Sequence, residues 1–488
     1  MPCTTILVGK KASNDGSTLV ARNDDSPSGV FHVKKMVLVK SEQQMKIYKS
    51  ALSDNEIPLP SDPLPYTAMP NVDLKEGIWA AAGINSENVA MSATETITSN
   101  ERVLGADPLI AYDEEKKKYK GGIGEEDFVV LVLPYIHSAR EGVLRLGQLL
   151  ETYGTYESNG IAFQDKEEIW WLETIGGHHY IAKRVPDDQV VIMPNQFGLD
   201  HFDFEDAYGE GKENLCSKDL KEFVKKYHLN LQHDCEDEFN PRLSFGSHAD
   251  SDHVYNTPRA WFMGRYLCPR SLRWEGENRD FSPEDNDIPF SLLPERKIAV
   301  EDVKYLLSSH YQGTPYDPYG RDNPEKGKYR CIGVNRTSFL ACTQIRGDVD
   351  ERISAIEWIA FSSNVYNAFV PVFTNTEIIP EYYSNTTMKV DTNNFYWANR
   401  LIAALSDAHF NFNSIHIERY QNAVANQSYQ YINELEASFK EGKGSQEEID
   451  KINQKIADMA KEETDKVLNK VLYETSLHMK NAFARSDN

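Results

Sequence analysis

A cysteine stands at the third position of the chain, directly ahead of a run of β-branched and apolar residues. Most cysteines in such a place are small buried hydrophobic side chains. Cys3 could instead be a nucleophile, provided that Met1 and Pro2 are removed. Its own α-amino group, with a pKa of about 7.7–8.0, could then accept the proton of a thiol whose pKa is about 8.5. Position alone leaves both interpretations open.

Two predicted strands bring charged side chains to this cysteine. Residues 3–8 and 18–22 have strand composition, and Asn14-Asp15-Gly16 is a strong turn signal between them. The second strand ends at Arg22-Asn23-Asp24-Asp25. Because the two free ends of an antiparallel hairpin lie side by side, Cys3 and this charged cluster are predicted neighbours.

Arg22 and Asp25 have two interpretations in that position. A cation near the sulfur would favour the thiolate, and a carboxylate would orient the protonated amine. Alternatively the two side chains form an ion pair at a turn, which contributes little at a surface.

The order of predicted elements indicates the fold class. Strands are predicted at 78–83, 88–94 and 330–375, an antiparallel meander at 159–195, and helices at 124–153 (interrupted at Pro134), 257–267 and 394–484 (interrupted near 442–444). Alternating groups of strands and helices favour an α+β protein built on antiparallel sheets. We expect a main domain at 3–393 and a helical C-terminal extension at 394–488 packed on it, whose helices could also mediate formation of a homo-oligomer.

Composition excludes several classes of partner. The net charge of -23 repels phosphate backbones and anionic membrane surfaces, so we expect no nucleic-acid and no membrane partner. No run approaches the roughly 20 apolar residues that span a bilayer. The first residues lack the features of a signal peptide, and the six cysteines are irregularly spaced. We therefore expect a cytoplasmic protein with reduced thiols.

No metal or cofactor site is predicted. The sequence has neither a glycine-rich phosphate loop nor an HExxH motif. His178 and His179 are adjacent, so on a strand they would point to opposite faces. His248 and His253 are predicted to belong to a polar loop.

Several segments together resemble a known family. The opening Cys3-Thr-Thr-Ile-Leu-Val-Gly-Lys-Lys-Ala-Ser, and then Ala-Arg22, closely resembles the bacterial cysteine dipeptidases of the C69 peptidase family, with secernins as more distant relatives. Further similar segments lie at 83–97, 138–142, 173–180, 184–188 and 355–358. The resemblance spans at least residues 3–375. It implies the four-layer αββα sandwich of N-terminal nucleophile hydrolases.

The resemblance also implies site residues. The Cys, Arg and Asp pattern of the related bile-salt hydrolases and penicillin V acylases maps onto Cys3, Arg22 and Asp25. An asparagine that would stabilise the oxyanion maps onto Asn195, although a turn-forming role after Pro194 is the alternative. A later arginine maps onto Arg259, which could support the nucleophile, grip a substrate carboxylate or simply be solvated.

Glu95 departs from the pattern of those amidases. It stands where they have an asparagine, and an ionised carboxylate cannot donate a hydrogen bond to an oxyanion. It could pair with the free ammonium of a dipeptide, or it could be a surface glutamate.

The sequence therefore predicts a dipeptidase that forms a thioester on Cys3 and acts on small unblocked dipeptides without a cofactor. The alternatives are an amidase of acylated amines with the same fold, a non-enzymatic secernin-like protein and, with least support, a papain-like peptidase.

Overall fold

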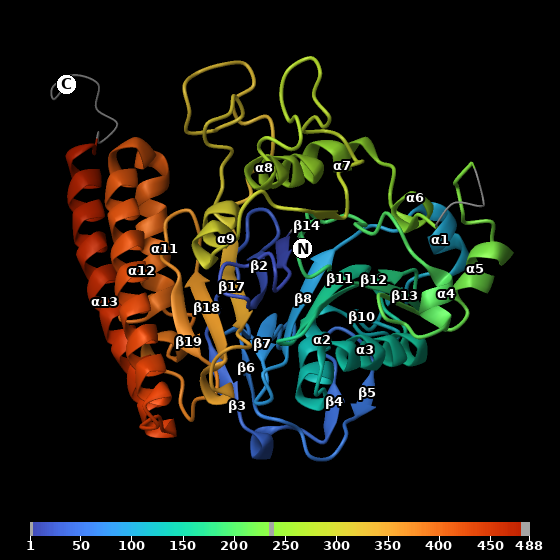
Figure 1. Cartoon of the computed structure of the whole chain (residues 1–488), viewed down its shortest axis with the longest axis horizontal. Coiled ribbons are helices and arrows are strands. Elements are labelled where there is room, and N and C mark those ends of the chain that lie inside the picture. Colours follow the sequence, from blue (N-terminus) through green and yellow to red (C-terminus); the bar gives the residue numbers. More distant parts are fainter. Residues whose placement is uncertain (1–2, 234–238, 480–488) are drawn as a thin grey trace.

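The computed structural model describes residues 3–233 and 239–479, and within these ranges the side chains of 93–95 are outside the description. Two large antiparallel sheets dominate (Figure 1). The larger sheet has, in spatial order, β16 (Ser291–Leu292), β14 (Val190–Met193), β1 (Thr4–Val8), β2 (Thr18–Asp25), β17 (Thr337–Ile345), β18 (Ala355–Phe361) and β19 (Val370–Phe373). The smaller has β15 (Asn214–Cys216), β13 (His179–Arg184), β12 (Ile169–Ile175), β11 (Asn159–Gln164), β8 (Ala90–Thr96) and β7 (Ala82–Ile84).

The predicted opening hairpin forms the middle of the larger sheet. Thr4 pairs with Asn23 and Thr5 with Arg22, so the start of β1 lies beside the end of β2. Successive residues of β1 enter different apolar cores: Ile6 faces the core that includes the C-terminal helices, and Leu7 faces the core between the sheets. A strand buried on both faces reads as a continuous apolar run, which is the pattern of residues 3–8.

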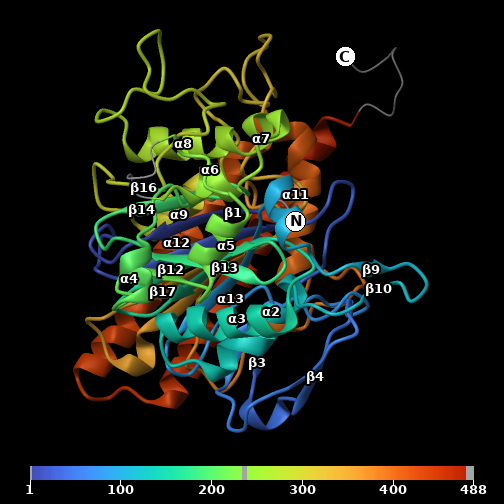
Figure 2. The same cartoon turned by 90° about the vertical axis from the view of Figure 1, so that its right-hand side faces the viewer.

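Helices cover the smaller sheet on the side away from the larger one. α2 (Glu125–Val132) and α3 (Ala139–Tyr153) pack on Phe163 of β11, whereas the neighbouring Ala162 faces the core between the sheets. Gly142 allows α3 to approach closely, since a Cβ atom there would stand 2.3 Å from the Phe163 ring. In Figures 1 and 2, α8 (Thr257–Leu267) lies above β14, and α2 and α3 lie below β12 and β13.

The meander predicted at 159–195 is wrong in its last strand. β11, β12 and β13 are consecutive neighbours in the smaller sheet, but β14 crosses to the larger sheet, where Met193 pairs with Thr5. The pattern of apolar residues predicts a buried strand but does not specify its partner. Through this crossover, the residues after Met193 come close to the start of β1.

The predicted C-terminal helices are α11 (Phe395–Ser406), α12 (Phe410–Lys440) and α13 (Gln446–Leu477), with the break at 441–445. Their apolar sides share one core with β18 and β19. The side chain of Asn453 on α13 also bonds both backbone groups of Phe373 on β19, at 3.0 and 2.9 Å. These helices thus pack against β18 and β19, while the division into a main domain at 3–393 and an extension at 394–488 remains a prediction.

The remaining elements are short. They are β3 (Val37–Val39), β4 (Ile47–Lys49), β5 (Glu56–Pro58), β6 (Tyr66–Ala68), β9 (Tyr112–Asp113), β10 (Lys118–Tyr119), α1 (Glu101–Ala106), α4 (Phe204–Tyr208), α5 (Leu220–Lys226), α6 (Pro241–Phe245), α7 (Asp250–Tyr255), α9 (Val300–Leu307) and α10 (Glu381–Ser384). Among the described helices, none combines the length and the apolar character of a bilayer span.

Candidate active site

Cys3 lies directly before β1, fully buried, and its sulfur faces the charged end of β2. Nη1 of Arg22 is 3.3 Å from the Cys3 Sγ. The pairing of Thr5 with Arg22 accounts for this contact, because Cys3 and Thr5 are two residues apart and share one face of the strand. The prediction that Cys3 and Arg22 are neighbours is therefore confirmed.

Arg22 belongs to a buried network of four charges. Its Nη1 is also 3.1 Å from Oε1 of Glu125, and its Nη2 is 3.8 Å from Oδ1 of Asp24. The other oxygen of Asp24 is 3.1 Å from Nζ of Lys34. None of these four side chains is more than 2% exposed. Two cations thus alternate with two carboxylates, which is the condition under which charges are tolerated out of water.

The network favours the charged forms of Arg22 and Asp24. Burial is the largest influence on the pKa of Arg22 and would lower it, but Cys3, Asp24 and Glu125 together raise that pKa above its usual value. Burial would likewise raise the pKa of Asp24, yet Lys34 and Arg22 lower it below its usual value. A permanent positive charge therefore lies in contact with the Cys3 sulfur, and such a charge favours the thiolate.

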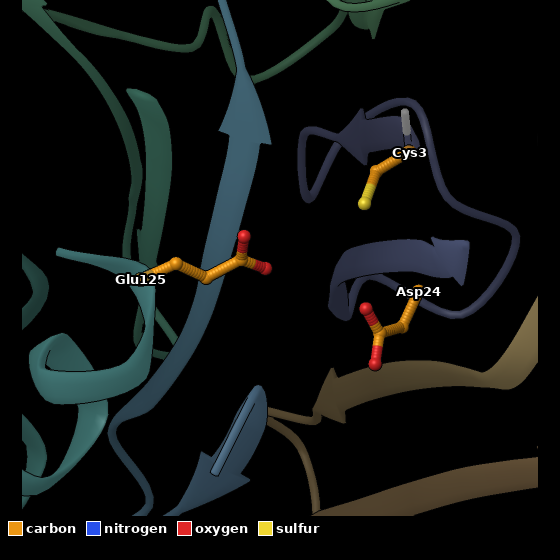
Figure 3. Close-up of side chains that lie close together, drawn as sticks. All are labelled: Cys3, Asp24 and Glu125. Atoms are coloured by element: carbon orange, nitrogen blue, oxygen red, sulfur yellow. The ribbon is translucent and has the colours of Figure 1, made fainter. Parts of the chain in front are cut away.

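The Cys3 sulfur and one oxygen each of Asp24 and Glu125 lie within 4.8 Å of one another, a grouping that metal ligands also show. Figure 3 shows the three side chains pointing toward one another, Cys3 from the residue before β1, Asp24 from β2 and Glu125 from α2. The guanidinium of Arg22 contacts this group and already supplies its positive charge. We therefore treat these residues as a charge network around a thiol.

Arg259 links the backbone of the cysteine to the region after β14. Nη1 donates to the carbonyl oxygen of Cys3 and, at 2.7 Å, to Oγ1 of Thr4. Nη2 donates to Oδ1 of Asn195 at 3.0 Å and to Oδ1 of Asn256 at 2.8 Å. The side chain is fully buried, so the solvated alternative for Arg259 is wrong.

Asn195 lies close to the same group and is 7% exposed. Its backbone is left-handed, with φ of +68°, a conformation that asparagine adopts more readily than most residues. Its Nδ2 donates to the carbonyl of Thr96 at 3.1 Å. The structure thus joins Cys3, Arg22, Asn195 and Arg259, all predicted from the sequence, in one buried region.

Two further predicted residues are Asp25 and Glu95. Oδ1 of Asp25 accepts a hydrogen bond from Thr337 at 2.6 Å, and its other oxygen pairs with Arg330. Its role toward the Cys3 amine remains a prediction. The backbone of Glu95 pairs with Gly160 in the smaller sheet, but its side chain lies outside the described residues.

Sequence reasoning gave no role to Asp24, although it placed the cluster that contains Asp24 beside Cys3, and it missed Lys34 and Glu125. A signal existed for Asp24, because residues two apart on a strand share a face and Asp24 therefore follows Arg22 toward Cys3. Lys34 and Glu125 arrive from a loop and from the first turn of α2, and nothing in their local sequence indicates this.

The expectation that His178 and His179 point apart is wrong. Nδ1 of both rings lies against Asp107, at 2.8 and 2.7 Å. His178 precedes β13, in the turn, so the alternation of strand side chains does not apply to it. This cluster is distinct from the Cys3 region.

The site is a buried thiol in contact with a guanidinium. Comparison with known proteins gives the family to which the chain belongs. The chain belongs to peptidase family C69, which matches residues 2–423. It is similar to a dipeptidase of Bifidobacterium longum, with 51% identity over 532 residues and all of both chains covered. A probable dipeptidase A of Streptococcus pyogenes is 51% identical over 489 residues, again covering both chains completely. Dipeptidase A of Lactobacillus helveticus is 43% identical over 482 residues, covering 97% of this chain and 96% of the other.

Proposed function

We propose that this peptidase is a dipeptidase whose nucleophile is the sulfur of Cys3. The contact of 3.3 Å between that sulfur and Arg22, inside a buried charge network, carries the proposal. Relatives that match the chain over its full length and are named dipeptidases support the substrate class. We further propose that the two sheets and their helices form the αββα sandwich of the N-terminal nucleophile hydrolases, with its four layers in that order.

The reaction would proceed through a thioester. After removal of Met1 and Pro2, the α-amine of Cys3 takes the thiol proton, and the sulfur attacks the carbonyl carbon of the first residue of the dipeptide. The amine returns the proton to the leaving nitrogen as the peptide bond breaks, which releases the second amino acid. Water then attacks the thioester with the same amine as base, which releases the first amino acid and restores the thiol.

The surrounding residues have separate roles in this reaction. Arg22 stabilises the thiolate, and Asp25 orients the amine. Asn195 stabilises the oxyanion, because its side-chain nitrogen donates hydrogen bonds. Arg259 positions both reacting parts, since it bonds the Cys3 carbonyl and Asn195 together. Glu95 pairs with the substrate ammonium. Arg259 is fully buried and its guanidinium already donates to oxygens of the protein, so it has no donor left for the substrate carboxylate.

Removal of Met1 and Pro2 is a requirement of this scheme, because Cys3 has an amide nitrogen and no basic amine while Pro2 is attached. Intact-mass measurement and N-terminal sequencing of the active protein test it. We expect a chain that begins at Cys3. A fully active chain that still begins at Pro2 would contradict the role of the amine as base.

The decisive variants are Cys3→Ala and Cys3→Ser, with Cys342→Ala as the matched control. Cys342 is also fully buried, and burial raises the pKa of its thiol, as expected for a structural cysteine. We expect both Cys3 variants to lose turnover of a dipeptide while circular dichroism shows an unchanged fold, and the control to keep turnover. Retained activity in Cys3→Ala would refute the nucleophile.

A substrate panel separates this function from its alternatives. We expect cleavage of a dipeptide and little cleavage of its N-acetylated form, a conjugated bile salt or penicillin V. Preference for a blocked or acylated substrate would favour the amidase alternative. A folded, correctly processed protein that cleaves none of them would favour a non-enzymatic, secernin-like role.

We also propose a cytoplasmic location, where thiols stay reduced. All five cysteines of the described residues are free thiols, whereas Cys235 lies outside these residues. Assembly into a homo-oligomer remains a proposal. It is supported by exposed apolar side chains near one end of the α12–α13 pair: Phe412, Ile415, Leu472, Tyr473 and Leu477.

A further inference from the structure

A cavity of about 520 Å³ lies between α9 and α12, with residues of β18 and the loop after it on its wall. Its volume falls within the range of about 300–1,000 Å³ typical of small-molecule sites. Aromatic side chains form much of its wall: Tyr305, Trp358, Tyr366, Phe369 and Phe410. Cys3, Arg22, Asn195 and Arg259 are not among its lining residues.

Lys304 on α9 also lines this cavity, and its surroundings are unusual for a lysine. Its Nζ donates to Oγ of Ser308 at 2.7 Å and to the carbonyl oxygen of Asn364. Burial lowers the pKa of Lys304 to about 7. Both partners of the amine are therefore uncharged oxygens.

Lys34 is an instructive comparison within the same chain. Its buried ammonium has Asp24 at 3.1 Å, and a carboxylate partner is the usual condition for burying a lysine. Among the ion pairs of residues 3–233 and 239–479, none includes Lys304. An external anion gains binding energy beside such an amine, because it supplies the opposite charge that stabilises the ammonium form.

The other charged groups on the wall do not provide that partner. Asp317 is held by His310, whose Nδ1 is 2.8 Å from Oδ1 of the carboxylate. Glu301 and Glu418 line the cavity but belong to residues that are exposed to solvent. Because solvent screens exposed carboxylates, they oppose an incoming anion only weakly.

We propose that this cavity is a second ligand site, separate from Cys3, that binds small aromatic carboxylates. The carboxylate of the ligand pairs with the ammonium of Lys304, and its ring packs among the aromatic side chains. Both halves of the ligand are needed, because the wall combines the amine of Lys304 with five aromatic side chains.

Phenylacetate is the probe that tests the site. 2-Phenylethanol keeps the ring but lacks the charge, and acetate keeps the charge but lacks the ring. Calorimetric titration of the full-length protein should detect binding of phenylacetate, and at least about tenfold weaker binding of the other two. Lys304→Met should reduce phenylacetate affinity by a similar factor, whereas Lys440→Met, on α12 outside the cavity, should leave it unchanged. Dipeptide turnover should be unaffected by Lys304→Met, so failure of this site and failure of the proposed function are distinguishable.

A second measurement uses the reactivity of the amine. Reductive methylation with formaldehyde and cyanoborohydride near neutral pH, mapped by mass spectrometry, should modify Lys304 readily, and phenylacetate should protect it. Equal phenylacetate affinity in wild type and Lys304→Met, or absence of binding and protection at millimolar phenylacetate, would overturn the proposal.

Discussion

Nη2 of Arg259 lies 3.0 Å from Oδ1 of Asn195, and this contact determines which end of the asparagine side chain accepts a hydrogen bond. Because a guanidinium only donates, the atom facing it must be the oxygen. The nitrogen end then donates, and it lies 3.1 Å from the Thr96 carbonyl. Arg259 thus fixes the nitrogen as the donating end of the Asn195 side chain, and the proposed oxyanion role depends on that nitrogen.

The first prediction concerns this donor. Asn195→Asp keeps the shape of the side chain but replaces the N–H donor with an oxygen, so we expect kcat to fall by about 100- to 1,000-fold with a smaller change in KM. Steady-state kinetics on a dipeptide measures both values. Asn195→Gly is the companion variant, since glycine accepts the φ of +68° without strain and should lose a similar factor. Near-normal kcat in either variant would remove Asn195 from the mechanism.

The second prediction concerns the charge beside the sulfur. Arg22→Met removes the cation that favours the thiolate, so alkylation of Cys3 by iodoacetamide should require a pH higher by about one unit or more. Mass spectrometry of the labelled peptide gives the rate at Cys3 alone. The control is Arg352→Met, which removes an exposed arginine paired with Asp350, and its labelling profile should match that of the wild type. A profile in Arg22→Met that does not move would show that the guanidinium has no influence on the thiol.

The third prediction tests the buried network through stability. Glu125→Gln leaves Arg22 with one fewer opposite charge in a place that water does not reach, so the free energy of unfolding should fall by about 2–3 kcal/mol. Urea denaturation measures this change. Glu56→Gln removes a glutamate whose pair with Lys49 is exposed, and it should cost less than about 1 kcal/mol. Equal effects of the two substitutions would mean that the network contributes no more than a surface pair.

The fourth prediction is a substitution that should raise the free energy of unfolding, whereas Glu125→Gln should lower it. Glu357 on β18 is fully buried, and burial raises its pKa to about 7 from an ordinary value of 4.5, although a hydrogen bond of 2.7 Å from Thr67 lowers it somewhat. Between these two values the folded state binds a proton that the unfolded state has lost, so Glu357 lowers stability as the pH rises. Glu357→Gln should therefore raise the free energy of unfolding at pH 8 by up to about 3 kcal/mol and change it little at pH 4.5. A gain of the same size at both pH values would contradict the titration of Glu357.

The sequence was informative where the controlling interactions are local. The hairpin that places Arg22 beside Cys3 needs only two short strands and the turn at 14–16, all within the first 25 residues. The C-terminal helices were predictable because their apolar spacing persists over many turns. Asn195 and Arg259 were predicted from the family resemblance, because no local sequence pattern indicates a functional role for them.

What could not be predicted depends on packing between distant segments. Glu125 reaches Arg22 only because α2 covers the smaller sheet and the two sheets face each other. The pairing of β14 with β1 in the larger sheet could not be predicted either, because the pattern of apolar residues does not specify the partner of a strand. Both interactions join residues more than 100 positions apart.

The shared core of β18, β19 and the last three helices has a practical consequence for making shorter versions of this protein. The match to the family ends at residue 423, within α12, so a gene trimmed to that limit would cut this helix. A cut ahead of Phe395 would remove all three helices and expose the apolar side chains of β18 and the edge strand β19 to solvent. Such fragments should precipitate on expression, and tools built on this scaffold need the chain through α13.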